Sequence, residues 1–524
     1  MSASKEKRKR QENKSSGVSV KNAREEQNKQ ENKKVRTLAI VIAAVVVVLL
    51  AAALFINSKY VRRNLTALRI NDVNYTVTDC NYYYYTTYFD YVNTVYQNFG
   101  DSASALLPDN SRPFGSQIHD EETGETWADF FEQMAMSAMQ DDAVVFSEAR
   151  SVGYQLSAEK QEEMDKQIAD MKQTVADAGT FKTYDDYLEA YYGSGMDEES
   201  FRRVAEMKYI VDEYSNHVRD SFTYTPDQLE ANYQDNRNTF DVFNYRYFLV
   251  YAEEVDKTLY EGDEAGLEAA EQEAMDAAME KAVAYMEGIH SEADMIAAAR
   301  DYDAETFKED DSTFRAYKGE LLGSIYGDWL REDGRKEGDV TTAETTTGFY
   351  VVYFISRSDN HYETVNARVL TVEPETVDYS RYADDEDTTA YDTAVKDAEE
   401  EAVTRAKTLY DNWTADGASE DAFITMFSEN SEDDTYEEGY AENICRDQFP
   451  GRVDNWLYDP ARQPGDHALV SSGTTQYILY FKGIGRQYSD VISEDKLRTN
   501  DYNNWKASIA GTDVRKTWVY ALAE

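Results

Sequence analysis

Two short aromatic strings decide how the second half of this sequence is read: GFYVVYF at residues 348–354 and TQYILYF at residues 475–481. They lie 127 positions apart, and each has a tyrosine at its third place, Tyr350 and Tyr477. Val, Ile, Phe and Tyr favour strands, so each string predicts a buried β-strand. The same strand written twice indicates an internal repeat.

The sequence around the two strings predicts the same order of strands and helices in both copies. NYRYFLVYA at 244–252 and NARVLTVEP at 366–374 each predict a strand, followed by an acidic loop, a long Ala-rich helix and a shorter helix. Trp329 and Trp456 share the offset of 127 with the final strands. We therefore expect two α+β domains of one topology. Their expected bounds are 240–358 and 364–486.

The part of the chain before the repeats predicts helices. LRINDVNYTVTD at 68–79 indicates two short strands and a helix start, and the large apolar residues of 81–99 recur at helical spacing. Asp197 and Thr225 precede helical runs as N-caps, and a proline follows Thr225 at the first helical position. The expected bounds are 60–238 for a mainly helical module and 487–524 for a C-terminal helix that packs on it.

Residues 37–56 read TLAIVIAAVVVVLLAAALFI, an uncharged and mostly apolar run. At about 1.5 Å per helical residue it matches a hydrocarbon core of ~30 Å, so it predicts a single transmembrane helix in the cell membrane. The tail before it, residues 1–36, is rich in Lys and Arg, which predicts a cytoplasmic N-terminus and an extracytoplasmic C-terminal part. A signal peptide cleaved near Ala51–Ala53 is the alternative.

Acidic residues dominate the composition. The chain has 101 Asp and Glu against 53 Lys and Arg, a net charge of −48, which repels nucleic acid and excludes it as an expected partner. Only two cysteines occur, Cys80 and Cys445, and two buried free thiols are favoured over one bridge. The sequence contains no HExxH, CxxC, EF-hand loop or fitting phosphate loop, so we expect neither a metal nor a cofactor.

Four stretches of sequence carry a family resemblance; they are INDVNYTVTD at 70–79, MDEESFRRVAEMKYIVDEY at 196–214, TPDQLEANYQDN at 225–236 and DAFITMFSENSEDD at 421–434. Together with the twofold strand–helices–strand order, they resemble the extracytoplasmic foldases of the PrsA and SurA type. In those proteins a SurA-like helical module, joined by a C-terminal helix, carries one or two parvulin (PpiC-type) peptidyl-prolyl isomerase domains. The resemblance covers about residues 65 to 522.

Parvulin active sites are built around two histidines, one on the first strand and one on the last. The first-strand pattern, small-x-His-Ile-Leu-Val, falls on Tyr247 in the first copy and on Arg368 in the second. The last-strand pattern, Gly-Tyr-His-Ile-Ile, falls on Tyr350 and Tyr477. A tyrosine hydroxyl can replace one hydrogen bond, whereas a buried arginine charge is expensive. We expect weak or absent isomerase activity in the first copy and none in the second.

The resemblance implies a membrane-anchored foldase or chaperone that binds unfolded or partly folded exported polypeptides. An active peptidyl-prolyl isomerase and a non-enzymatic envelope scaffold are the alternatives. No catalytic residue is assigned. The expected substrate-binding residues are Tyr247, Trp329, Tyr350, Trp456 and Tyr477. Ordinary packing of these aromatic side chains in the two cores is the competing interpretation.

Overall fold

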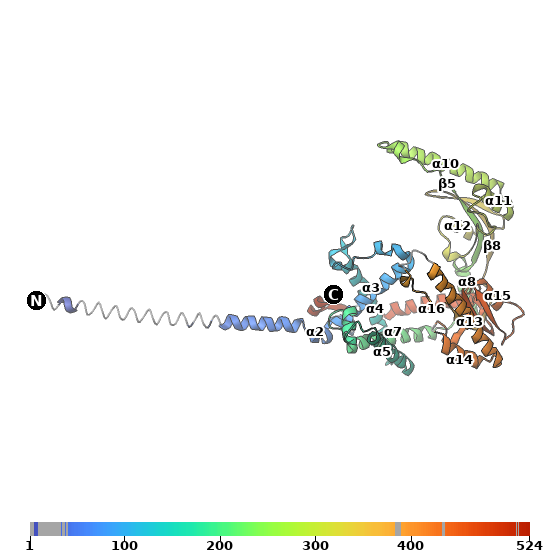
Figure 1. The fold of residues 1–524 in the computed structure, drawn as a ribbon. Coiled ribbons are helices and arrows are strands. Elements are labelled where there is room, and N and C mark those ends of the chain that lie inside the picture. Colours follow the sequence, from blue (N-terminus) through green and yellow to red (C-terminus); the bar gives the residue numbers. More distant parts are fainter. Residues whose placement is uncertain are drawn as a thin grey trace. The chain divides into compact units, whose positions relative to one another are not determined.

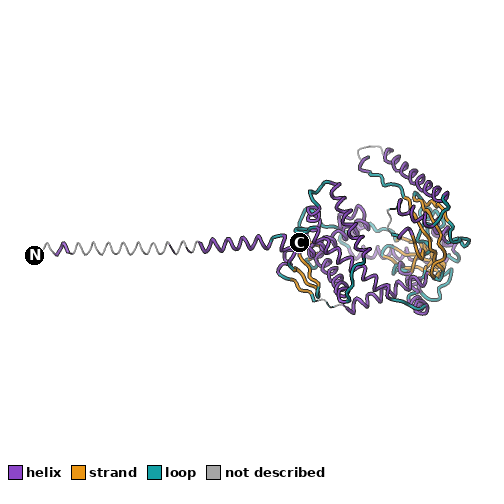
Figure 2. Tube along the Cα trace, turned by 90° about the horizontal axis from the view of Figure 1, so that it is seen from below, coloured by secondary structure: helices purple, strands orange, loops and turns teal. Residues whose placement is uncertain are grey.

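The computed structural model describes residues 5–8, 33, 37, 40–382, 389–431, 435–509, 511 and 513–523. The chain forms two compact units, Met1–Phe222 with Asp501–Glu524, and Thr223–Asn500. Helices dominate the described part of the first unit, whereas the two larger sheets belong to the second unit (Figures 1 and 2).

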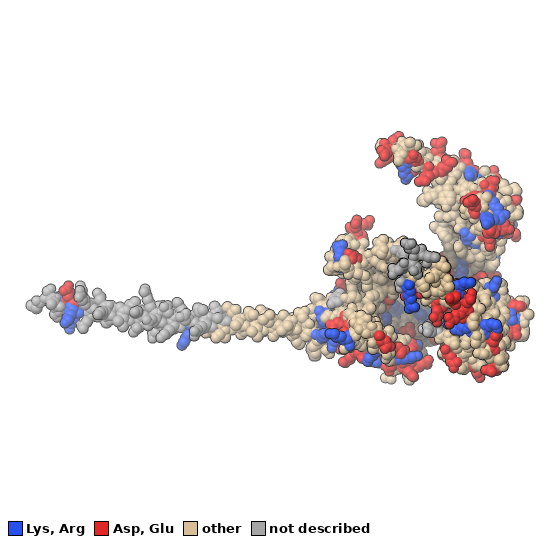
Figure 3. All heavy atoms as spheres, in the orientation of Figure 1, with Lys and Arg blue, Asp and Glu red and all other residues tan. Residues whose placement is uncertain are grey.

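The predicted transmembrane helix at residues 37–56 is wrong. Residues 38 and 39 lie outside the described residues, and the described helical stretch that follows, 40–56, carries no charged side chain (Figure 3). Among the described residues, no helix combines the length and the apolar character that a membrane crossing requires. The described part of the chain is a mixed helix-and-sheet fold, and the predicted fold class is corrected to this. The predicted single-pass location in the cell membrane depended on the same helix and is wrong as well.

The first unit combines a helical bundle with a small sheet. Its helices are α2 (Lys59–Asn64), α3 (Val77–Phe99), α4 (Trp127–Ser151), α5 (Ala158–Ala178), α6 (Tyr184–Tyr192) and α7 (Glu198–Ser221). Its sheet, of order β13-β1-β2, consists of β1 (Thr66–Ile70), β2 (Val73–Thr76) and β13 (Val514–Lys516). A separate ribbon pairs β3 (Ile118–Asp120) with β4 (Glu125–Thr126).

The two strands and the helix start predicted at 68–79 are confirmed as β1, β2 and the beginning of α3. Thr76 and Asp79 form a capping box there. The predicted cap Asp197 is also confirmed, since its carboxylate accepts a bond of 2.9 Å from the Ser200 backbone N–H. Such caps satisfy backbone donors that the first helical turn leaves without partners.

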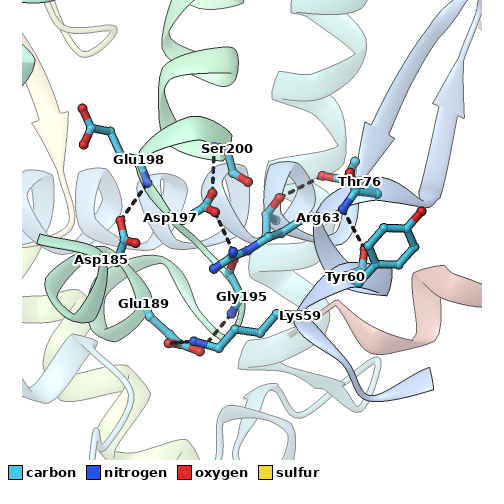
Figure 4. A network of polar contacts seen from close by, with 12 residues as sticks. Lys59, Tyr60, Arg63, Thr76, Asp185, Glu189, Gly195, Asp197, Glu198 and Ser200 are labelled. Atoms are coloured by element: carbon cyan, nitrogen blue, oxygen red, sulfur yellow. Dashed lines mark hydrogen bonds and ion pairs between the residues drawn. The ribbon is translucent and has the colours of Figure 1, made fainter. Parts of the chain in front are cut away.

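A polar network fastens α2 to the turn between α6 and α7 (Figure 4). Nε of Arg63 donates to the Gly195 carbonyl at 2.6 Å, and its Nη1 lies 2.7 Å from an Asp197 carboxylate oxygen. Lys59 pairs with Glu189 at 2.6 Å, and Glu189 also accepts from the Gly195 backbone N–H. The segment that follows the 40–56 stretch is therefore held on the helices of the first unit.

The last part of the chain alternates between element types. α16 (Tyr488–Ile509) takes up the beginning of the predicted C-terminal helix, and β13 and a 3₁₀ turn (Trp518–Leu522) follow it. The hydroxyl of Tyr502, on α16, lies 2.8 Å from that of Ser215 on α7. β13 pairs with β1, so sequence-distant segments share the small sheet.

The second unit contains two antiparallel sheets with the same strand order. The first sheet, β6-β5-β8-β7, is formed by β5 (Val242–Tyr251), β6 (Phe314–Lys318), β7 (Val340–Thr345) and β8 (Gly348–Ser358). The second, β10-β9-β12-β11, is formed by β9 (Glu363–Val372), β10 (Tyr440–Ile444), β11 (His467–Ser472) and β12 (Thr475–Gln487). The two repeated strings form parts of the inner strands β8 and β12.

Helices accompany each sheet in corresponding places. Before β5 come α8 (Pro226–Asp235), where the predicted Thr225 cap is confirmed, and α9 (Arg237–Phe240). The first sheet has α10 (Glu264–Gly288), α11 (Glu292–Tyr302) and α12 (Gly327–Arg331), and the second has α13 (Thr389–Ala415), α14 (Glu420–Asn430) and α15 (Gly451–Leu457). The assignment of these two parts to the parvulin family stays a prediction.

The two faces of the first sheet are covered differently. Phe248 and Val351 pack on the side of α10 and α11. Tyr245, three positions from Phe248, and Val352, one position from Val351, belong to a core on the opposite face, together with Leu330 of α12. This alternation follows from the period of two in a strand. It divides the sheet into a helix-covered face and a face that carries the candidate site.

Candidate functional site

The α12 face of the first sheet brings three tyrosines together. The ring centroids of Tyr247 on β5 and Tyr350 on β8 lie 5.3 Å apart, with the rings nearly perpendicular. Tyr326, directly before α12, lies 5.8 Å from Tyr247 and 5.2 Å from Tyr350. All three are half-buried. We call Tyr247, Tyr326 and Tyr350 the tyrosine cluster.

A packed layer supports the tyrosine cluster from below. Phe243, Tyr245 and Val352 are almost fully buried in this layer. The hydroxyl of Tyr245 lies 3.4 Å from that of Tyr326. Burial raises the pKa of Tyr326 and of Tyr350 above the usual value, so both phenols are protonated and uncharged at neutral pH. The site therefore presents aromatic rings on a buried layer, and the hydroxyl groups of Tyr326 and Tyr350 are neutral.

Exposed apolar side chains lie on β6 and on the segment between β6 and the tyrosine cluster. Tyr317, Leu321 and Ile325 are 42%, 66% and 49% exposed. An aromatic floor with an open apolar border is typical of surfaces that bind other polypeptides, because it offers contact area that water solvates poorly. The cluster and its border can thus hold apolar side chains of a second chain.

Arg315, on β6, lies against the tyrosine cluster. Its Cζ is 4.9 Å from the ring centroid of Tyr247, and its Nη2 donates to the Tyr247 hydroxyl at 3.4 Å. Nη1 donates to the backbone carbonyls of Ser312 and Phe314 at 3.0 and 2.6 Å. These bonds fix a guanidinium group at the edge of the candidate site.

The second sheet does not reproduce the tyrosine cluster. Tyr247 pairs with Val352 across the first sheet, and Val369 pairs with Leu479 across the second, so Val369 is the equivalent of Tyr247. By the same repeat, Val453 corresponds to Tyr326, and it is fully buried. At these two positions the second sheet has aliphatic side chains where the first sheet has rings.

Two further comparisons complete the contrast between the sheets. Ala441 is the equivalent of Arg315, because it pairs with Ala367 as Arg315 pairs with Tyr245. Ala441 is almost fully buried, so the second sheet lacks a guanidinium group at this position. Tyr477 matches Tyr350, but its ring meets Phe449, at a centroid distance of 6.2 Å. Of the residues expected to bind substrate, Tyr247 and Tyr350 make a direct ring contact. Trp329 packs against the same core as these two, and Trp456 and Tyr477 pack against the core of the second sheet.

Arg368 does not occupy the position of Tyr247. It pairs with Tyr480 across the second sheet, as Arg246 pairs with Tyr353 across the first, so Arg246 is its equivalent. A difference of one residue turns a strand side chain to the opposite face. There Nε of Arg368 donates to Glu420 at 2.8 Å. The charge is buried and paired, away from the face that carries Tyr477.

Trp329 and Trp456 take part in a repeated stack. The Cζ of Arg335 lies 4.0 Å from the ring centroid of Trp329, and Arg462 has the same distance to Trp456. Each arginine also donates from Nε to the carbonyl of its tryptophan at 3.1 Å. A guanidinium group covers one ring face in each copy, so the structure gives both tryptophans a packing contact.

Tyr326 and Arg315 were not found from the sequence. Both lie between α11 and the end of α12, where no helical or strand periodicity marks a face. The repeat contained a usable signal, since Tyr326 differs from Val453 at the common offset of 127. Among the described residues, no group of three or more His, Cys, Asp or Glu side chains is placed to hold a metal ion.

No known family profile matches the chain, and no curated protein matches it. It is similar to the solved structure of peptidylprolyl isomerase (PrsA) from Bacillus cereus, with 11% identity over 62% of this chain and 96% of that one and a TM-score of 0.23. Foldase protein PrsA from Streptococcus pneumoniae str. Canada MDR_19A has 13% identity over 54% and 91%, with a TM-score of 0.20. PrsA from Bacillus subtilis has 14% identity over 54% and 88%, with a TM-score of 0.14. With identities and TM-scores this low, function has to be argued from the site itself.

Proposed function

We propose that this chain is a polypeptide-binding foldase or chaperone, and that the tyrosine cluster is its binding surface. The observation that supports this proposal is the meeting of Tyr247, Tyr326 and Tyr350 beside exposed apolar side chains. The clients are unfolded or partly folded exported polypeptides, whose apolar side chains pack on the rings. Tyrosine suits such a role because it contributes large contact area and adaptable hydrogen bonding at low entropic cost.

The geometry favours loose binding. Few rings are available, so the contact area is well below the ~1,600 Å² of a stable protein interface. The floor beneath the cluster is fully packed, so the rings are held in place before a client arrives and little ordering entropy is lost. Weak binding to a preformed surface allows a client to leave and fold.

Peptidyl-prolyl isomerase activity is the second candidate, because Tyr247 and Tyr350 adjoin on neighbouring strands and burial, which raises the pKa of Tyr350, keeps the Tyr350 hydroxyl protonated. Rotation about an X-Pro bond has a barrier of roughly 20 kcal/mol and requires groups that favour the twisted amide. We rank polypeptide binding before isomerase activity because the Tyr247 hydroxyl already accepts a hydrogen bond from Arg315 and is therefore engaged within the chain. A proline peptide converted at the uncatalysed rate by the full chain excludes the enzyme; acceleration lost in Tyr350→Phe supports it.

The binding proposal predicts that the full chain suppresses aggregation of a chemically denatured test protein. Replacing Tyr247 or Tyr350 by Ala removes a ring from the surface. Truncation of a central aromatic residue costs about 1–2 kcal/mol of binding, so each variant requires roughly five to thirty times more protein for equal suppression. Light scattering at several molar ratios measures the effect.

Tyr477→Ala is the matched control, because it removes the same ring from the same strand position of the second sheet. We expect it to suppress aggregation as the unaltered chain does. Circular dichroism and thermal melting establish that each variant is folded. No suppression by the unaltered chain at stoichiometric excess contradicts the proposal, as does an equal loss in Tyr477→Ala.

A further inference from the structure

Arg315 is unusual among the arginines of its region. The others described between residues 240 and 358 each pair with a carboxylate; the pairs are Arg246–Glu292, Arg300–Asp310, Arg331–Asp328, Arg335–Glu332 and Arg357–Asp241. Within this described range, Arg315 alone has only a ring, a hydroxyl and two backbone carbonyls as partners. In a chain with 101 acidic residues against 53 basic ones, an arginine without an acid at a binding surface requires an explanation.

The hydrogen bonds of Arg315 leave part of its guanidinium group available. The group has five N–H donors, of which two on Nη1 and one on Nη2 are used. The Nε–H and the second Nη2 hydrogen remain, and paired N–H groups of this kind bind a carboxylate through two parallel bonds. Because the side chain is only half-buried, a carboxylate can reach it from the solvent.

We propose that Arg315 determines specificity by binding an Asp or Glu side chain of the client, next to the apolar residue that packs on the tyrosine cluster. This inference rests on the proposed function and names the class of segment that the surface selects. The second sheet has the buried Ala441 at the same place, so the selection belongs to the first sheet alone.

The overall negative charge of the chain opposes the binding of acidic segments, so a local effect of Arg315 can be distinguished from the effect of net charge. A net charge of −48 repels acidic segments at long range. Salt at physiological strength screens exposed charges beyond ~8 Å, whereas a direct contact with Arg315 is affected much less. A preference for an acidic peptide therefore cannot come from the general field and has to come from a local cation.

Fluorescence anisotropy with the full chain tests this assignment. The probes are two labelled, unstructured peptides with the same aromatic and aliphatic core, identical except for Glu or Gln beside that core. At physiological salt we expect the Glu peptide to bind about tenfold more tightly, as a charge-assisted hydrogen bond predicts. Arg315→Gln removes the preference, and Arg315→Lys, which keeps the charge without the paired donors, reduces it.

Arg452→Gln is the matched control. Arg452 is an exposed arginine of α15, so this variant loses the same charge elsewhere and retains the Glu preference. If the unaltered chain binds neither peptide, the proposed function fails. If it binds both equally, or if folded Arg315→Gln and Arg315→Lys variants keep the full preference, the assignment of Arg315 is overturned and polypeptide binding stands. An equal loss of preference in Arg452→Gln overturns it as well.

Discussion

Tyr350 and Tyr477 occupy one strand position in two different surroundings. Tyr350 contacts two other tyrosine rings, whereas Tyr477 contacts Phe449 and has Val369 in place of Tyr247 on the neighbouring strand. The same side chain therefore forms part of a half-open aromatic surface in the first sheet and of a filled core in the second. The neighbours of a repeated residue, more than its identity, decide what it can bind.

A single carboxylate in the second sheet gives a pH-dependent prediction. Burial raises the pKa of Glu420, but hydrogen bonds from Lys482 and Arg368 outweigh this effect and hold the pKa below its usual value. A lowered folded pKa stabilises the protein above the unfolded value of ~4.3, and this stabilisation is lost as the pH falls below it. We expect Glu420→Gln to lower the free energy of unfolding at pH 7 by about 2 kcal/mol, and by less near pH 3.5. Urea titrations at both pH values measure it.

Glu292→Gln provides the comparison for this prediction. Glu292 corresponds to Glu420 in the first sheet and pairs with Arg246, but Ile355 stands where the second sheet has Lys482. The loss of one cationic partner instead of two predicts a smaller effect at pH 7. An equal effect of the two substitutions, or a Glu420→Gln difference that does not change with pH, contradicts the argument.

At the scale of elements, local patterns could be read from the sequence and register could not. The strands β8 and β12 and the caps at Asp197 and Thr225 follow from apolar runs and side-chain chemistry that act within a few residues. The family pattern small-x-His-Ile-Leu-Val placed Arg368 and Tyr247 at one position, whereas the strand pairing makes Val369 the equivalent of Tyr247. β9 is buried almost continuously from Val365 to Leu370. Without alternation between buried and exposed positions, nothing in the strand distinguishes one register from the next.

The two strings begin with different residues, Gly348 and Thr475, and the strand pairing explains why the first string has a glycine. β5 extends to Tyr251, which lies opposite Gly348, and a Cβ on Gly348 would lie 2.1 Å from the Val250 carbonyl oxygen. In the second sheet the pairing of β9 with β12 begins one position later. We therefore expect Gly348→Ala to lower the free energy of unfolding by at least ~2 kcal/mol, measured by urea denaturation.

Gly473→Ala serves as the reference for this substitution. Gly473 has a φ of +60°, but the space that an added methyl group would occupy is open. Only backbone strain therefore opposes the change, and we expect a loss of about 1 kcal/mol. Equal losses at the two positions would show that the close approach to β5 does not limit Gly348.

At the scale of the whole chain, the predicted order of strands and helices reflects an internal repeat, and the predicted bounds of the parts stay predictions. The twofold order of strands and helices has its counterpart in two sheets of one strand order, because each copy carries its own apolar pattern. The 20-residue apolar run at 37–56 predicted a membrane span from its length and composition, and this prediction is wrong, since no helix among the described residues meets both requirements. The division at Asn500, inside α16, has no mark in the sequence, since a helix continues through it.

The two cysteine thiols differ in burial, which allows the unfolding of the first unit to be measured separately. Both are free: Cys80 is buried in the core of the first unit, and Cys445 is half-buried in the second. Burial raises the pKa of Cys80, so its reactive thiolate is scarce at neutral pH. We expect a thiol reagent to modify Cys445 first and Cys80 only when the first unit unfolds, so that its labelling in increasing urea reports the stability of that unit. A Cys445→Ser chain should retain only the slow thiol; rapid labelling of Cys80 in the folded chain contradicts its burial.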